Sequence, residues 1–420
     1  MSRLEGLVSS EDVISSWAAI EHLYDPIAAD EDAKAVLHES ARHIDGIEEA
    51  IKHIDLIDSE HAGALSRLGY GFCKDPGVWR TKTEAVLQAR ALQQVAACCH
   101  SLGRDDSRLA RIVVRHTFDP RFHMPTPSWI PHPASGLSFI VMPFVYQEIL
   151  LLTAKSVVQF VTGSSNGDVW NALEANNSQD FSAYRPAPPA LRQFIARLLT
   201  AEAFDPIDPG ENPFSRLKTL SPWFADASET VGEPTPFETA LAYSAQDFSI
   251  SHELGHSLTD ASQVDVIDLL QVEIAADEAG FGLYAVSWGW RDEILEGTPL
   301  SQAARIVLGP LWFYFTATLT FTLMTLVAAR VAAVSPANME SFSGKCHLNH
   351  IEQLAQRWQG ASNLLSRHIS LVKSYSGEFS SEDEEMLMRL VGLLDGYVRS
   401  LQHWVASIPD ADLLAALSVS

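Results

Sequence analysis

Two histidines one helical turn apart, His252 and His256, have the spacing in this chain that most directly predicts chemistry. Glu253 follows the first of them, in a His-Glu-x-x-His pattern. On a helix, residues i and i+4 project from the same face, so two imidazoles can bind one zinc ion. The glutamate between them can take a proton from a water whose pKa the zinc lowers from about 15.7 to about 7. The motif therefore predicts a zinc-dependent hydrolase, and among these a peptidase.

The residues around the motif predict a buried helix. Phe248, Ile250 and Leu254 place apolar side chains two to four positions apart, which is typical of a helix packed against a core. The alternative is a solvent-facing helix that carries two unrelated histidines. Leu258 and the apolar residues that follow Asp260 argue against this alternative, because they extend the apolar surface beyond the motif.

A catalytic zinc site needs a third protein ligand and keeps a fourth position open for water. Glu273 is the candidate ligand, and Asp277, four residues later, shares its face of a helix. The small residues Ala276 and Gly280 would let this second helix lie close against the motif helix and bring Glu273 to the metal. Asp277 could then accept a hydrogen bond from one imidazole and fix its tautomer.

Two alternatives to this third ligand remain open. Glu273, Asp277 and Glu278 could form the solvated face of an ordinary helix, which is the usual role of charged residues at this spacing. Other carboxylates near the motif could also replace Glu273 as the ligand: Asp260, Asp265, Asp268 and Glu278.

Zinc histidines followed by a Glu-x-x-Ala-Asp-x-x-Gly segment resemble the gluzincin metallopeptidases. The resemblance covers about thirty of the 420 residues, and sixteen residues separate His256 from Glu273. It implies that His252, His256 and Glu273 are zinc ligands. It also implies that Glu253 is the general base and that Asp277 supports a ligand from outside the coordination sphere. The cofactor that the resemblance implies is Zn²⁺, and the substrate is a protein or peptide.

Zinc peptidases also need a cationic or hydrogen-bonding group that stabilises the tetrahedral oxyanion. His350 and Arg357, about two turns apart on a helix, are the candidates for this role. Similar membrane-type gluzincins carry a His-Pro pair and a later arginine downstream of the ligands, whereas His350 is followed by Ile351. The alternative for this segment is a helix N-terminus with surface histidines.

The composition narrows the range of partners and locations. A net charge of −24 over 420 residues argues against binding to a nucleic-acid backbone. The four cysteines lack the spacing of a disulfide framework or of a structural zinc site. No apolar leader follows Met1, so we expect a reducing, cytoplasmic location.

The pattern of apolar residues predicts a mainly α fold, with a helical zincin-like metallohydrolase core and an N-terminal helical region. It predicts a helix from Thr83 to Leu102 and another from Pro143 onward. The predicted regions are helical residues 1–200, a Pro-, Gly- and acid-rich loop at 201–246, the core at 247–375 with an apolar helix at 306–334, and C-terminal helices at 376–420.

No convincing strand precedes the motif helix. Many zincins have a strand upstream of this helix along which the substrate lies, so its absence would argue against the usual peptide-binding edge. Residues 117–136 hold five prolines and predict an irregular, extended crossing rather than a regular element.

Two further groups of polar residues predict structure rather than function. Five histidines are scattered through the first part of the chain without a ligand pattern, and we expect them at the surface: residues 22, 38, 43, 53 and 61. The acidic run Ser381-Glu382-Asp383-Glu384-Glu385 predicts the N-terminus of a helix.

The segment from Ile306 to Ala329 carries no charge and is long enough to span a bilayer, which needs about 20 apolar residues. Gly309-Pro310 near one end and five threonines in the middle argue against a span. A helix that is apolar on all sides is also typical of the centre of a large helical protein. We therefore expect a core helix, with membrane association as the alternative.

The function that these residues predict is hydrolysis of a peptide bond by a zinc metallopeptidase, in which Glu253 is the general base. Two other classes remain open: a non-proteolytic helical interaction protein with a regulatory or vestigial zinc site, and a zinc enzyme that acts on a small molecule. The presence of Glu253 favours catalysis, because a purely structural zinc site has no use for a base at that position.

Overall fold

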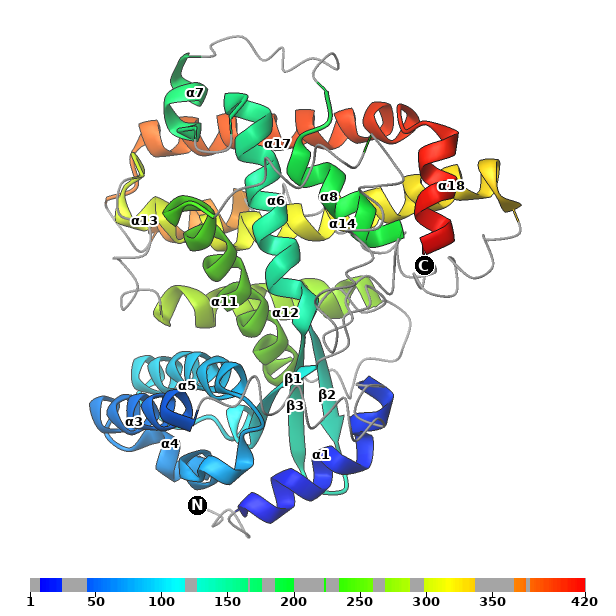
Figure 1. Ribbon diagram of the computed structural model, residues 1–420. Coiled ribbons are helices and arrows are strands. Elements are labelled where there is room, and N and C mark those ends of the chain that lie inside the picture. Colours follow the sequence, from blue (N-terminus) through cyan, green and yellow to red (C-terminus); the bar gives the residue numbers. More distant parts are fainter. Residues whose placement is uncertain are drawn as a thin grey trace. The chain divides into compact units, whose positions relative to one another are not determined.

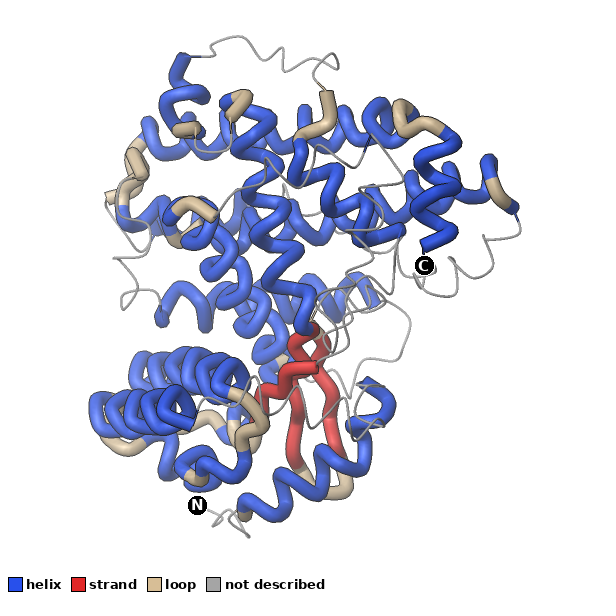
Figure 2. Tube along the Cα trace, viewed as in Figure 1, coloured by secondary structure: helices blue, strands red, loops and turns tan. Residues whose placement is uncertain are grey.

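The computed structural model describes residues 8–24, 44–117, 127–164, 167–175, 186–199, 223, 234–259, 269–287, 298–336, 366–374 and 378–419. Within these ranges the chain is mainly helical, as the sequence predicts, and it also holds one three-stranded sheet (Figures 1 and 2). The chain divides into two compact units. The first unit comprises Met1–Asp119, Thr126–Phe144 and Asp247–Arg291, and the second unit comprises the remaining residues.

The first unit is built around α5 (Lys82–Leu102), which packs against α3 (Ile44–Glu60) and α12 (Leu269–Ser287). The side chain of Thr81 caps the start of α5 by accepting a hydrogen bond from the backbone of Glu84, so the predicted helix in this segment is confirmed. The other helical elements of this unit are α1 (Ser10–Tyr24), α4 (Ala64–Arg67), the C-terminal part of α11 (Pro236–Leu258), and the 3₁₀ turns η2 (Tyr70–Lys74), η3 (Pro76–Val78) and η4 (Ser107–Leu109).

The sheet of the first unit has the order β1-β3-β2 (Figure 1). Strand β3 (Leu137–Pro143) lies in the middle, parallel to β1 (Ile112–Thr117) and antiparallel to β2 (Ser128–His132). All the residues of β1 are buried, so the strand lacks the alternation of apolar and polar residues that marks a half-exposed strand.

The prediction that no strand precedes the motif helix is therefore wrong, and so is the prediction of an irregular crossing at residues 128–132. Pro131 belongs to β2, which lies at an edge of the sheet that the described residues form. Proline cannot donate to a central ladder, but an edge strand tolerates it. The prolines of this segment thus exclude a central strand and not an edge strand.

The predicted boundaries differ from the two units. The motif helix α11 begins at Pro236, within the segment 201–246 that the sequence predicts as a loop. The predicted core at 247–375 is divided, because Asp247–Arg291 belongs to the first unit and the residues that follow belong to the second. Both units combine segments distant in sequence, which a prediction of contiguous regions cannot detect.

The second unit is helical in its described parts. Helix α6 (Phe144–Thr162) begins directly after Pro143, as predicted, and the other helices are α7 (Val169–Ala175), α8 (Pro189–Leu199), α13 (Gln302–Arg305), α14 (Leu308–Val334), α17 (Ser381–Ala406) and α18 (Asp410–Val419). The acidic run at 381–385 does start a helix: Ser380 and Asp383 form a capping box at the N-terminus of α17.

Helix α14 is the apolar segment that the sequence predicts as a core helix or a membrane span. Gln302–Val334 is long and apolar enough to cross a membrane, and it is the one such helix among the described residues. In the second unit α14 packs against α8, α17 and α18, and most of its side chains are buried, including Phe315, Leu319 and Leu323. This packing supports the interpretation as a core helix.

One of the histidines expected at the surface is buried. His61 is 7% exposed, and its ring centroid lies 5.5 Å from that of His100. Burial lowers the pKa of His61, and the neighbouring His100 lowers it further. His22 and His53 are exposed, as expected, and the histidines at positions 38 and 43 lie outside the described residues.

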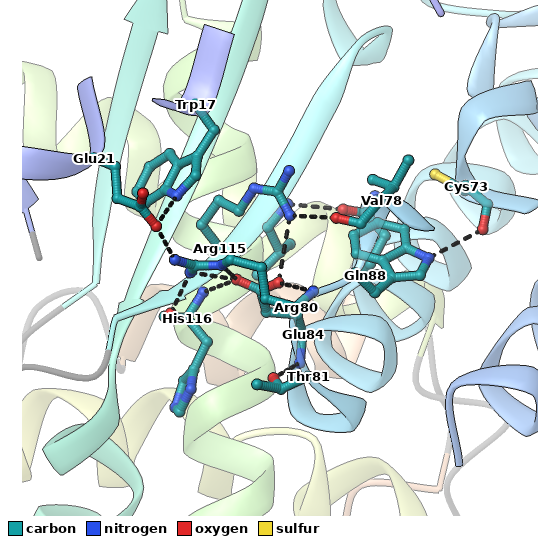
Figure 3. A network of polar contacts seen from close by, with 12 residues as sticks. Trp17, Glu21, Cys73, Val78, Arg80, Thr81, Glu84, Gln88, Arg115 and His116 are labelled. Carbon is teal, nitrogen blue, oxygen red and sulfur yellow. Dashed lines mark hydrogen bonds and ion pairs between the residues drawn. The ribbon is translucent and has the colours of Figure 1, made fainter. Parts of the chain in front are cut away.

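A network of buried charges joins α1, α5 and β1 in the first unit (Figure 3). Arg80 donates to Glu84 at 2.9 Å and to the carbonyl oxygen of His116 at 2.6 Å, and it forms an ion pair with Glu21. Arg115 donates to the second oxygen of Glu84 at 3.3 Å. Because two guanidinium groups face two carboxylates, the network is neutral as a whole, which offsets the cost of burying its charges.

Two groups in this region, Glu84 and His116, have lowered pKa values for different reasons. Burial raises the pKa of Glu84, but the positive charges of Arg80 and Arg115 outweigh this effect and lower that pKa to about 2. Burial lowers the pKa of His116 to about 4. Both groups therefore bind a proton more weakly in the folded protein than in the unfolded chain, where their ordinary pKa values are 4.5 and 6.5.

These shifts predict a loss of stability in acid. Between pH 6.5 and 4 the unfolded chain protonates His116 and the folded protein does not, so the free energy of unfolding falls as the pH falls. We expect this residue to account for a loss on the order of 3 kcal/mol over that range. Urea unfolding of the wild type and His116→Gln at several pH values measures the effect. The variant should have the shallower pH dependence, and parallel curves would contradict the assignment.

Candidate metal centre

The helix that carries the His-Glu-x-x-His motif is α11, and its start is fixed by local hydrogen bonds. The backbone N–H of Thr235 donates to the Glu238 carboxylate at 2.8 Å, and the backbone N–H of Glu238 lies 3.2 Å from the Thr235 hydroxyl oxygen. This reciprocal pair is a capping box, and Pro236 occupies the first turn, where a missing N–H costs nothing. His252 and His256 lie in the last turns of the helix, before it ends at Leu258.

Glycines let α11 and α12 approach each other until their backbones touch. A Cβ atom on Gly255 would lie 2.2 Å from the carbonyl oxygen of Ala276. A Cβ atom on Gly280 would lie 2.7 Å from the carbonyl oxygen of Ser251 and 2.8 Å from the Cα atom of His252. Each distance is too short for any side chain, so the helices reach this separation only because glycine stands at both contacts.

This approach places Glu273 of α12 beside the two histidines of α11. The Nε2 atoms of His252 and His256 are 3.2 Å apart. Carboxylate oxygens of Glu273 lie 3.3 Å from the first of these nitrogens and 3.7 Å from the second. The three residues form the one group of possible metal ligands found within the described parts of the chain.

The spacing of these atoms fits a tetrahedral metal. Three donor atoms that each lie about 2.1 Å from one zinc ion in tetrahedral geometry are about 3.4 Å from one another. The two Nε2 atoms are 3.2 Å apart, and each faces its own oxygen of Glu273: Oε2 lies 3.3 Å from His252 and Oε1 lies 3.7 Å from His256, so all three separations are close to that value. Two imidazoles and one carboxylate are also a ligand set that catalytic zinc sites use. The residues present therefore fit a zinc ion in both distance and chemistry.

Asp277 contacts the first histidine on the ring nitrogen that faces away from the other possible ligands. Its carboxylate lies 2.8 Å from Nδ1 of His252, and the residue is completely buried. A proton on Nδ1 that is donated to this carboxylate leaves the lone pair of Nε2 free to face the other two ligand atoms. The structure thus places Asp277 against the His252 imidazole, on the side away from Nε2.

Glu253 lies next to the ligand group but outside it. Its carboxylate oxygen is 3.8 Å from Nε2 of His252, and the residue is only 4% exposed. The cluster is open to solvent at Glu273, whose side chain is 34% exposed. A water molecule at an open coordination position would therefore lie within reach of a sheltered carboxylate.

A set of buried polar contacts with α5 supports the motif helix, and the sequence does not reveal it. The Ser251 hydroxyl lies 2.6 Å from the side-chain oxygen of Gln94, and the amide nitrogen of Gln94 donates to the Asp247 carbonyl at 3.0 Å. The Asp247 carboxylate forms an ion pair with Arg90. These contacts join residues more than 150 positions apart, so no local pattern could have indicated them.

Strand β2 also reaches the ligand group, through an aromatic side chain that sequence analysis missed. The indole ring of Trp129 stacks on the imidazole of His256, with ring centroids 6.1 Å apart and planes inclined by 20°. His256 is half-buried, and its ring also meets that of His252 edge-on at 4.7 Å. The sequence offered only a single tryptophan in a proline-rich segment, which does not indicate a contact with His256.

The other residues predicted for the site fall into two groups. The oxyanion candidates His350 and Arg357 lie outside the described residues, as do the alternative ligands Asp260, Asp265 and Asp268. Glu278 is described, but it is exposed and does not belong to the group of possible ligands. Among the described carboxylates, Glu273 is therefore the one that belongs to the group of possible ligands.

Comparison with known proteins adds no relative to this picture, because no family model, no curated protein and no solved structure matches the chain. The functional interpretation consequently depends on the geometry of the site.

The glycine contact predicts the effect of adding one methyl group. Gly255→Ala should lower the free energy of unfolding by about 1–3 kcal/mol, because its Cβ would collide with the backbone of α12. Gly282→Ala is the matched control, since Gly282 is an exposed residue of α12 with no other atom near its Cβ position. It should instead stabilise the protein by about 0.5–1 kcal/mol. Urea denaturation measures both, and equal effects would contradict the close helix contact.

Proposed function

We propose that the chain is a zinc-dependent metallopeptidase of the gluzincin type, with a zincin-like core formed by the helices that carry the motif. The observation that carries this proposal is the convergence of His252, His256 and Glu273: the two Nε2 atoms are 3.2 Å apart, and a carboxylate oxygen of Glu273 lies 3.3 or 3.7 Å from each, separations close to those of ligands around one tetrahedral metal. The sequence resemblance assigns the same three residues independently of that geometry.

Each side chain of the centre has a distinct task in the proposed reaction. His252, His256 and Glu273 would hold the metal, and Asp277 keeps His252 in the required tautomer. Zinc at such a centre supplies an acidified water and polarises a substrate carbonyl. Glu253 would be the general base of the reaction, able to take a proton from the water and to donate it to the leaving amine. Its burial beside the ligand group keeps bulk water from competing for that proton.

A peptide as substrate is supported by the sheet edge. Strand β2 lies at one edge of the sheet that the described residues form, and its Trp129 contacts the ligand His256. An extended peptide can add to an exposed strand edge through main-chain hydrogen bonds. A strand next to the metal would therefore hold a peptide bond close to the reacting groups, which a small-molecule enzyme does not require.

The metal site predicts a specific pattern of zinc content. Elemental analysis of the purified wild type should find about one zinc ion per chain, and His256→Ala and Glu273→Ala should lose most of it. Glu278→Ala is the matched control, because it removes an exposed carboxylate from the same helix. Wild-type protein that stays free of zinc after metal-replete purification would contradict the proposal. Full zinc content in Glu273→Ala would move the third ligand elsewhere.

If Glu253 is the general base, replacing it should impair catalysis but leave zinc binding unchanged. Glu253→Gln should retain the zinc content of the wild type, because Glu253 lies outside the ligand group. Cleavage of a mixed peptide library, followed by mass spectrometry, should be slower by about 10²–10⁴-fold in the variant. If zinc-loaded wild type cleaves no peptide in the library, the peptidase assignment fails and a regulatory zinc site becomes the better account.

A further inference from the structure

The two histidines of the metal centre are held in place by different kinds of contact. His252 is held by the carboxylate of Asp277 on α12, through a hydrogen bond to Nδ1. His256 lies under the indole of Trp129, which comes from β2. The two restraints thus reach the motif helix from two separate elements of the first unit.

Stacking controls a degree of freedom that matters for metal binding. The ring of a histidine can rotate about its bond to Cβ, and this rotation would swing Nε2 of His256 away from Nε2 of His252, 3.2 Å away. A large ring that is stacked within 20° of the imidazole plane opposes the rotation, because it limits the space into which the imidazole can turn. The centroid separation of 6.1 Å is typical of offset aromatic pairs.

The contribution of Trp129 comes from the face of its ring. The indole Nε1 is buried and has no hydrogen-bond acceptor within the structure described. A buried donor without an acceptor is unfavourable, so the polar group of this side chain does not explain its presence. The backbone of β2 is held by the sheet, where Trp129 lies opposite Ile140 of β3, and this pairing fixes the position from which the ring extends.

We propose that Trp129 is a positioning residue of the metal centre: its indole holds the imidazole of His256 in the plane that directs Nε2 at the metal. The inference deepens the proposed function and rests on it, because it requires that His256 be a ligand. Trp129 itself neither binds the metal nor transfers a proton.

Substitutions of Trp129 that remove or keep an aromatic ring test this role. Trp129→Leu and Trp129→Met keep an apolar side chain without a ring, and Trp129→Phe restores a ring face while it removes the unsatisfied N–H. Ile130→Ala is the matched control, because successive residues of a strand point to opposite faces of the sheet. Zinc affinity of the full-length protein is measured by competition with a chromophoric chelator. The visible absorption of the Co²⁺-loaded protein reports the ligand geometry.

We expect the two ringless variants to bind zinc about 10–100-fold more weakly than the wild type, as is usual when a group that orients a ligand is removed. Their Co²⁺ spectra should change, whereas Trp129→Phe and Ile130→Ala should keep the spectrum and most of the affinity. Wild-type affinity and spectrum in either ringless variant would overturn the inference, and so would an equal loss in Trp129→Phe. If the wild type binds no zinc, the proposed function fails, and the inference fails with it. If all variants bind equally well, only the role of Trp129 is wrong.

Discussion

The proposed metal centre depends on the backbone contact between α11 and α12 at Gly255 and Gly280. A methyl group at either position would overlap backbone atoms of the opposite helix, so the helices would have to separate. The ligand distances between Glu273 and the histidines are only 3.3 and 3.7 Å, and they would grow with any such separation. The two glycines therefore determine whether Glu273 can approach the two histidines closely enough to share a metal ion with them.

Helix α5 provides the platform for this contact, because it packs against α12 and its Gln94 contacts the motif helix near Ser251. At its other end, Glu84 belongs to the buried charge network with Arg80 and Arg115. A buried polar group without a partner is costly, so both sets of contacts specify one position for α5 more precisely than apolar packing would. The site is thus held by polar contacts that take no part in its chemistry.

Much of the centre could be predicted from the sequence, because its signals are local. The i, i+4 spacing of His252 and His256 fixes their shared face, and the spacing of Glu273 and Asp277 with small residues indicates a second helix nearby. Trp129 and Gln94 could not be predicted, because their partners are more than a hundred residues away and their own segments carry no distinctive pattern. The strands could not be predicted because β1 is buried on both faces and prolines surround β2. The division into two units could not be predicted because each unit joins segments that are distant in the sequence.

X-ray absorption at the zinc edge of the zinc-loaded full-length protein would show whether one zinc ion is bound by two imidazoles and one carboxylate. We expect a first shell of nitrogen and oxygen atoms only, at about 2.0–2.2 Å, with the multiple-scattering signature of two imidazoles. A sulfur shell at about 2.3 Å would contradict it, because it would place the metal on the cysteines instead. A shell without imidazole scattering would contradict it equally, because His252 and His256 would then not be ligands.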